Sequence, residues 1–142
     1  MEIRKLKNSE IDEVVALWYE TSVQAHDFIS PSHWERNREA MATQYLPNSD
    51  THVAIENNEI VGFVAMVESY LAAIFVSPSI QGKGVGHTLL DFVKESRETI
   101  ELKVYKKNSK ALAFYKGQSF LFVSEDIEKE TGEVECLLEW GN

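Results

Sequence analysis

The sequence predicts a single mixed α/β domain organised around one largely antiparallel sheet. Its 142 residues match the size of one ordinary domain, and no linker, repeat or low-complexity tract divides them, so we expect one domain over residues 1–142. Segments that alternate with period two are interspersed with segments of helical period. A helix is predicted between the two central strands, 71–76 and 99–105, and such a crossover requires these strands to be parallel.

Composition and charge exclude several classes of protein. Hydrophobic residues make up 44% and charged residues 26%, as in globular domains. No apolar run approaches the roughly 20 residues of a membrane-spanning helix. The charged N-terminal stretch lacks the apolar core of a signal peptide, so we expect a cytoplasmic protein with no membrane partner. The net charge of −9 argues against nucleic acid as a partner and mildly favours a cationic one.

No bound metal is expected. The single cysteine, Cys136, cannot pair within the chain and lies in an alternating apolar run typical of a core strand. The four histidines show none of the spacings that zinc sites use.

The N-terminal third predicts one short strand and two helices. Residues 2–6 alternate as a strand. Helices are predicted over residues 9–21 and 32–44, because each stretch carries apolar residues at helical spacing behind a capping-box pattern. The two patterns are Ser9-x-x-Asp12 and Ser32-x-x-Glu35, and Pro31 ends the irregular stretch between the helices.

The middle of the chain predicts a hairpin followed by the first central strand. Strands 51–56 and 60–67 flank the turn 57–59, whose asparagines tolerate the positive φ of tight hairpins. The continuous apolar run 71–76 predicts a strand buried on both faces, and Pro78 ends it.

A glycine-rich loop follows this strand and leads into a helix that reaches about residue 96. Gly82, Gly84 and Gly86 alternate through the loop, and a strand, such a loop and a helix N-terminus together form an anion site, so we expect a ligand that carries phosphate. The spacing fits neither a Walker A loop nor the dinucleotide fingerprint, whose third glycine would fall at His87. A purely structural turn is the alternative.

The last third predicts three strands and a short helix. Asn108 or Ser109 caps that helix and Gly117 ends it. The helix spans residues 110–116, and the strands span residues 99–105, 120–127 and 134–140, with a turn near residues 131–132.

Two motifs resemble those of the GNAT superfamily of N-acetyltransferases. QGKGVG (81–86) fits the acyl-CoA loop of this superfamily, which directly follows a strand and has the pattern Gln/Arg-x-x-Gly-x-Gly/Ala. NSKALAFY (108–115) fits the helix after the fifth strand of the family. Ser119 departs from the pattern, because the family usually has a glycine before Phe120, and this puts the geometry of that turn in question.

The resemblance implies the GNAT fold, in which a central parallel strand pair is splayed around the acyl-CoA arm and helices cover both faces of the sheet. It implies acetyl-CoA as co-substrate and a primary amine as acceptor, from a protein lysine, an N-terminus or a small molecule. The cofactor-binding residues that it implies are Ile74, Phe75, Val76, Gln81, Gly82, Lys83, Gly84, Val85, Gly86, His87, Asn108 and Tyr115.

The chemistry of acyl transfer points to further candidates. The attacking amine must be neutral, and the leaving thiolate needs a proton. Tyr115 is the candidate acid, Glu68 is the candidate base, and Tyr70 either lines the thioester site or covers the core. With Tyr70, His26 and Phe28 in the loop after the first helix are candidate acceptor contacts. Structural alternatives stay open: a core aromatic for Tyr115, a solvated charge for Glu68 and a loop histidine for His26.

A second function class also stays open, a non-catalytic acyl-CoA-binding regulatory module on the same fold. The presence of Asn108 and Tyr115 favours catalysis. We expect a monomer or a homodimer and a cationic acceptor. The acceptor mouth would lie between the loop 26–28, the hairpin end 68–70 and the final strand pair, and the acidic run 124–135 carries part of the excess negative charge.

Overall fold

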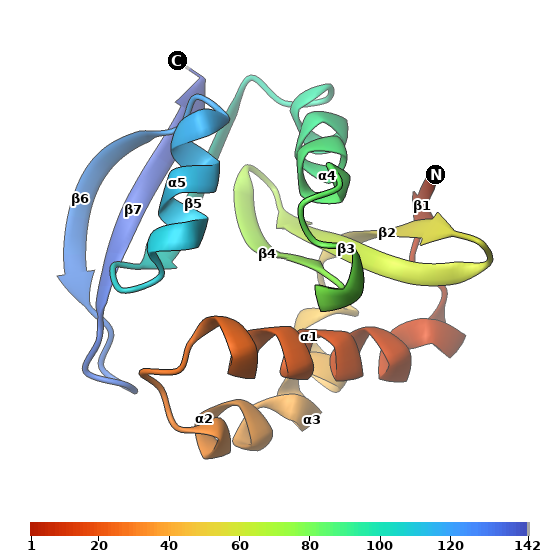
Figure 1. Ribbon diagram of the computed structural model, residues 1–142, viewed down its shortest axis with the longest axis horizontal. Helices are drawn as coiled ribbons and strands as arrows, with labels where there is room; N and C mark the ends of the chain where they lie inside the picture. Colours follow the sequence, from red (N-terminus) through yellow and green to blue (C-terminus); the bar gives the residue numbers. More distant parts are fainter. Residues whose placement is uncertain (142) are drawn as a thin grey trace.

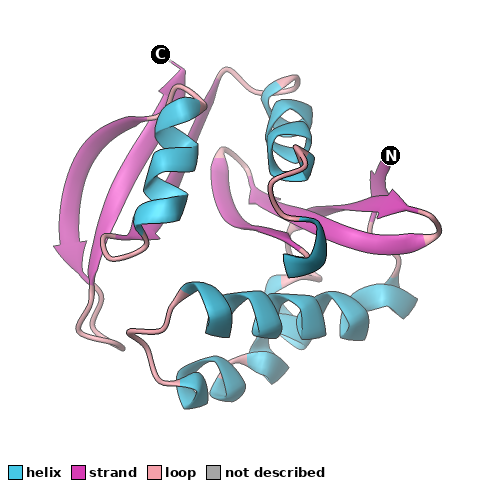
Figure 2. Cartoon of the chain, viewed as in Figure 1, coloured by secondary structure: helices cyan, strands magenta, loops and turns pink. Residues whose placement is uncertain are grey.

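The structure is a computed structural model that describes residues 1–141, and it consists of one seven-stranded sheet covered by helices (Figures 1 and 2). The strand order is β1-β2-β3-β4-β5-β7-β6. The strands are β1 (Glu2–Lys5), β2 (Asp50–Glu56), β3 (Glu59–Val67), β4 (Tyr70–Val76), β5 (Thr99–Tyr105), β6 (Leu121–Ile127) and β7 (Val134–Gly141). The helices are η1 (Asn8–Glu10), α1 (Ile11–Ala25), α2 (Pro31–Arg36), α3 (Arg38–Ala40), η2 (Met41–Tyr45), η3 (Pro78–Ile80), α4 (Val85–Lys94) and α5 (Ser109–Gly117).

The central strands β4 and β5 are parallel, as the crossover through α4 requires, whereas every other neighbouring pair is antiparallel. Their pairing is limited to Tyr70 and Glu101. Beyond this pair the strands diverge, and Figure 1 shows β1–β4 and β5–β7 as two halves that spread apart. The predicted mixed sheet with a splayed parallel pair is confirmed.

Two hydrophobic cores, one on each face of the sheet, hold the halves together. α4 buries Val85, Leu89 and Val93 in the core that it shares with α5. α1 buries Val14 and Trp18 in the core on the opposite face. Both helices therefore present an apolar stripe to the sheet and a polar face to solvent.

The first helix begins differently from the prediction. Glu10, and not Ser9, forms the N-terminal cap interaction, because its carboxylate accepts the backbone N–H of Lys7 at 2.9 Å. Arg4 holds this carboxylate in place through two hydrogen bonds of 2.9 and 2.7 Å. The helix also continues past residue 21 to Ala25, and its last turn reaches the functional site.

The second predicted helix is interrupted. Ser30, and not Ser32, is the N-cap, since its hydroxyl oxygen accepts the N–H of Ser32 and Pro31 occupies the first helical position. The helix breaks at Asn37, whose side-chain amide donates to the carbonyl of His33 at 2.7 Å and so competes with the backbone. A short α3 and a π-helical turn, η2, complete the segment.

In residues 1–141, no helix is long and apolar enough to cross a membrane.

The Arg4–Glu10 ion pair links β1 to the start of α1, and it predicts a pH-dependent stability. The hydrogen bond from Arg4, together with that from the Lys7 N–H, lowers the pKa of Glu10 from 4.5 to about 2. A depressed carboxyl pKa contributes stability that is complete above pH 4.5 and is lost as the pH falls toward 2. Because exposed ion pairs are worth at most about 1 kcal/mol, Glu10→Gln should lower the Tm at pH 7 by about 2–4 °C.

Thermal denaturation followed by circular dichroism at pH 7 and pH 2 measures this difference. Glu35→Gln is the matched control, because Glu35 forms a more exposed ion pair with Arg38 at 3.3 Å. Equal Tm losses at both pH values for Glu10→Gln would contradict the assignment.

Candidate active site

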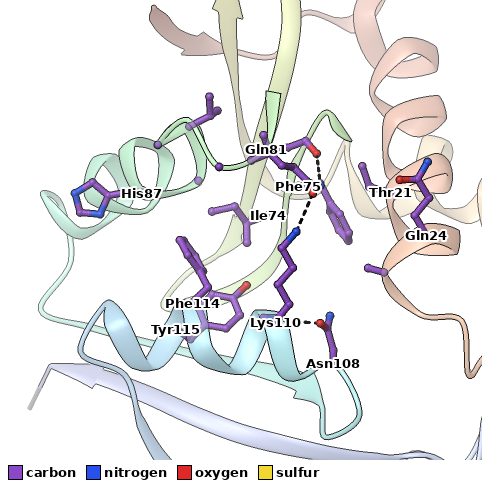
Figure 3. Close-up of a pocket in the computed structure, with 17 residues that line it drawn as sticks. Thr21, Gln24, Ile74, Phe75, Gln81, His87, Asn108, Lys110, Phe114 and Tyr115 are labelled. Atoms are coloured by element: carbon purple, nitrogen blue, oxygen red, sulfur yellow. Dashed lines mark hydrogen bonds between the residues drawn. The ribbon is translucent and has the colours of Figure 1, made fainter. Parts of the chain in front are cut away.

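A cleft of about 700 Å³ opens where β4 and β5 diverge (Figure 3). Its walls come from β4, the glycine-rich loop, α5 and the last turns of α1. A cleft of this size lies within the usual range for cofactor sites. The residues that line it are Thr21, Gln24, Ala25, Ile74, Phe75, Val76, Gln81, Gly82, Gly84, Val85, Gly86, His87, Asn108, Lys110, Ala111, Phe114 and Tyr115.

The edge of β4 that faces the cleft has hydrogen-bonding groups without a partner strand. The N–H of Ser77 donates to the carbonyl of Val61 on β3 at 2.8 Å. Along an antiparallel strand, successive N–H groups point alternately toward and away from the partner strand, so those of Val76 and Ile74 point away from β3. The Val76 carbonyl confirms this direction, since it accepts a hydrogen bond from Gln81 at 3.0 Å. Because β5 has already diverged, these two N–H groups can bind a ligand.

β4 is less buried than predicted. Ala72 is exposed, and Ile74, Phe75 and Val76 are only partly buried, because one side of the strand faces the cleft and no neighbouring strand. The expectation of burial on both faces was wrong for this reason.

The loop before α4 provides a second set of free donors. Gly82 and Gly84 have φ values of 84° and 86°, in the left-handed region that glycine adopts without strain. The carbonyl of Gly84 accepts the N–H of Thr88 at 3.0 Å, so the preceding N–H groups, of Val85, Gly86 and His87, have no acceptor within the helix. Together with the helix dipole, they form an anion site at the mouth of the cleft.

Two predicted cofactor residues place their side chains elsewhere. Lys83 does not line the cleft. The His87 imidazole is hydrogen-bonded to Gln118 at 2.7 Å and contacts Asp91 at 3.0 Å, so it points away from the cavity and only its backbone N–H is available (Figure 3).

Unlike Lys83, a predicted cofactor contact, Lys110 lines the cleft. Its ammonium group donates to Gln81 at 3.3 Å across the cleft (Figure 3). Thr21 and Gln24 of α1 form the opposite wall. Sequence reasoning missed all three, since their approach to the loop depends on tertiary contacts and no motif marks them.

Tyr115 lies at the inner end of the cleft and is only 8% exposed. Its hydroxyl has no hydrogen-bond partner among residues 1–141, and Figure 3 shows it directed toward Ile74. Burial raises the pKa of this hydroxyl, so it stays protonated at neutral pH and can donate to a ligand.

A second cavity, of about 240 Å³, adjoins the cleft. It has an aromatic lining from Trp18, Trp34, Tyr70 and Tyr105, and one carboxylate, from Glu135 on β7. Both cavities share six lining residues: Ala25, Ile74, Phe75, Asn108, Ala111 and Tyr115. A group bound in the second cavity would therefore meet a group bound in the cleft beside Tyr115.

His26 and Asn108 connect the two halves of the sheet beside this junction. The Asn108 side chain accepts the Ala111 N–H at 3.1 Å as the N-cap of α5, so its amide NH₂ points to His26 Nε2 at 3.3 Å. The other ring nitrogen, Nδ1, donates to the Ser22 carbonyl at 2.9 Å. Burial lowers the pKa of His26, which keeps the ring neutral, as this arrangement requires.

The remaining predicted acceptor residues differ in position. Tyr70 lines the second cavity, and Phe28 lines neither cavity but packs against His26 with ring centroids 5.7 Å apart. Glu68 lies in the exposed β3–β4 turn with φ 55°, where its carbonyl accepts a hydrogen bond from Arg97 at 2.9 Å. Since Glu68 lines neither cavity, the structure does not bring this candidate base to the site.

The turn after α5 keeps its geometry despite the departure at Ser119. Ser119 has φ 72°, the left-handed conformation that a glycine would adopt there. The N–H of Phe120 closes the turn on the Tyr115 carbonyl at 3.0 Å, so the helix end that positions Tyr115 is intact.

Comparisons with known proteins agree with this geometry. The model of the acetyltransferase (GNAT) domain matches residues 16–132. The chain is 32% identical over 139 residues to the peptidyl-lysine N-acetyltransferase YiaC of Escherichia coli, covering 97% of this chain and 95% of that protein. It is 29% identical to the peptidyl-lysine N-acetyltransferase YjaB of the same organism, covering 96% of this chain and 92% of that protein.

Solved structures show the same fold. The solution structure of apo YjaB from Escherichia coli has a TM-score of 0.87 at 24% identity and covers 99% of this chain and 98% of that chain. The PaiA N-acetyltransferase of Thermoplasma acidophilum, solved in complex with coenzyme A, has a TM-score of 0.81 at 20% identity over 99% of this chain and 98% of that chain.

The chain therefore belongs to the GNAT family of acetyltransferases. It is an acetyl-CoA-dependent N-acetyltransferase.

The left-handed Gly84 predicts a test of the anion site. Gly84→Val should weaken acetyl-CoA binding at least about tenfold, because a β-branched residue disfavours φ 86° and the loop would lose the conformation that exposes its N–H groups. A Cβ at Gly84 meets no atom within 4 Å, so the fold should be retained. Calorimetric titration with acetyl-CoA measures the affinity.

Gly117→Val is the matched control, since Gly117 also has open space around a Cβ, ends α5 and does not line the cleft. A folded Gly84→Val protein with wild-type affinity would remove this loop from the binding site.

Proposed function

We propose that this N-acetyltransferase acetylates the ε-amino group of lysine residues in peptides or proteins. The observation that carries the proposal is the second cavity, which has an aromatic lining and one carboxylate, that of Glu135, and which meets the cleft beside Tyr115. A lysine side chain has matching features, an apolar stem that packs against aromatic rings and a terminal ammonium that a carboxylate attracts. Both Escherichia coli relatives are named peptidyl-lysine N-acetyltransferases, which supports the same class of acceptor.

The cleft has the donors that acetyl-CoA requires. In this proposal the N–H groups of Val85, Gly86 and His87 bind the pyrophosphate, and Lys110 adds a positive charge. The free edge of β4 binds the pantetheine arm as an additional strand would, through the outward-facing groups of Ile74 and Val76. When bound, acetyl-CoA supplies an acetyl thioester that a neutral amine converts to an amide.

The residues at the junction of the two cavities direct the transfer. The β4 N–H groups are placed to stabilise negative charge on the carbonyl oxygen, and they are held by the sheet before the reaction begins. Tyr115 is placed to give its proton to the sulfur as the thiolate leaves. Exclusion of water by the aromatic walls strengthens both interactions.

A direct test uses lysine peptides blocked at the N-terminus. The protein should release free thiol from acetyl-CoA with such a peptide and should not do so with the same peptide carrying arginine, because the guanidinium does not become a neutral nucleophile near pH 7. Mass spectrometry locates the added acetyl group on lysine. Thiol release with small amines but with no lysine peptide would overturn the proposed acceptor.

Tyr115→Phe should lower kcat by about 10²- to 10⁴-fold while the affinity for acetyl-CoA stays close to that of the wild type. The hydroxyl acts when the thiolate leaves, whereas the ring still packs in the buried position. Steady-state kinetics and calorimetric titration measure the two effects separately.

Tyr45→Phe is the control, because it removes the same hydroxyl from an exposed position on η2, outside both cavities. If Tyr115→Phe keeps the wild-type kcat, Tyr115 serves only in packing.

A further inference from the structure

We propose that Glu135 is the base that takes the proton from the acceptor ammonium. The inference rests on the proposed lysine acetylation and goes beyond it, because it assigns the proton acceptor to a residue outside both sequence motifs. Among residues 1–141, Glu135 is the one carboxylate that lines either cavity.

The sheet fixes the position of Glu135. It lies on β7 between two paired strands, opposite Tyr105 on β5 and Asp126 on β6. Half-buried on this strand, it faces the same cavity as Tyr70 and Tyr115. A side chain on a strand paired on both sides is positioned more rigidly than one in the exposed turn that carries Glu68.

The other titratable side chains that line this cavity are unsuited to take the proton. His26 is hydrogen-bonded at both ring nitrogens, to Ser22 and to Asn108. Tyr105 is neutral and donates its hydroxyl proton to Glu128 at 2.7 Å. Burial raises the pKa of Tyr70, as does the charge of Glu135. Lys103 has neither a carboxylate nor an imidazole, and Tyr115 is the proposed proton donor.

Charged groups around Glu135 adjust its basicity in both directions. Burial and the neighbouring carboxylates of Glu128 and Asp126 raise the pKa of Glu135, whereas the ammonium of Lys103 lowers it. The net shift is upward, which makes Glu135 a stronger base than an exposed carboxylate. Glu128 is already occupied, since one of its oxygens accepts from Tyr105 and from Thr131.

The proton and electron balance is complete with the groups named. The carboxylate of Glu135 accepts one proton from the lysine ammonium, and the freed lone pair on nitrogen forms the C–N bond to the acetyl carbonyl carbon. The C–S bond breaks with its electron pair on sulfur, which receives a proton from Tyr115. The proton displaced from nitrogen passes to solvent, from which Tyr115 is reprotonated, and Glu135 releases its own proton to solvent.

The test compares Glu135→Gln with Glu139→Gln in the complete protein, using a lysine peptide as acceptor. Glu139 lies on the same face of β7 but lines neither cavity, so its substitution removes the same charge without touching the site. Glu135→Gln should lower kcat/KM for the peptide at pH 7 by about 10²- to 10⁴-fold. Its rate should keep rising with pH toward the amine pKa of about 10.4, whereas Glu139→Gln should follow the wild-type profile.

Two further measurements separate a lost base from a damaged site. Calorimetric titration should give the same acetyl-CoA affinity for the wild type and both variants. A peptide carrying S-aminoethylcysteine, whose amine is less basic than that of lysine, should recover part of the rate lost in Glu135→Gln, because less proton removal is needed. A wild-type pH profile in Glu135→Gln, or an equal loss with both peptides, would overturn the role of Glu135.

Failure of the lysine proposal gives a different result. In that case the wild type would acetylate another amine and no lysine peptide. The comparison of Glu135→Gln with Glu139→Gln on that amine would still decide whether Glu135 is the base.

Discussion

The divergence of β4 from β5 is the constraint on which the rest of the structure depends. Continuous pairing would have used the outward N–H groups of Ile74 and Val76 in a ladder, and no cleft would exist. Unpaired strand groups are tolerated here because they face a cavity that water or a ligand can enter. The opening is maintained by the separate cores on the two faces and by the His26–Asn108 hydrogen bond across it.

Local signals in the sequence predicted the parts of the site that depend on local geometry. The glycine spacing in 81–86 and the helix signature in 108–115 were sufficient to predict residues of the loop and Tyr115 that the structure brings together around one cleft. Glu135 and Lys110 could not be found in this way, because their roles depend on strands and helices that meet only in the folded chain. Glu68 was misplaced because a position at a strand end does not show which way a turn with positive φ directs its side chain.

Groups of opposite charge lie at opposite ends of the site. In the proposed function, the α4 N-terminus and Lys110 attract an anion in a protein whose net charge is −9, so these local donors must outweigh the overall field. At the other end, the Glu135 carboxylate lines the second cavity, and the charge of Glu128 acts on it. Tyr115 lies between them. The burial that raises the pKa of its hydroxyl also raises the pKa of a thiol in the same cavity, so the pKa of the proton donor and that of the thiol it forms remain matched.

At acid pH, protonation of Glu135 and protonation of His26 affect the protein in different ways. Protonation of Glu135 removes the proposed base. The pKa of His26 is lowered from 6.5 by burial, so the folded state opposes its protonation, and the stability that the neutral ring contributes is lost as the pH falls below 6.5. A proton on Nε2 would face the amide NH₂ of Asn108 and break the link between α1 and α5. Activity and stability that are lost together as the pH falls below 6.5 therefore point to His26, whereas comparing the pH profiles of Glu135→Gln and the wild type separates protonation of Glu135 from protonation of the acceptor amine.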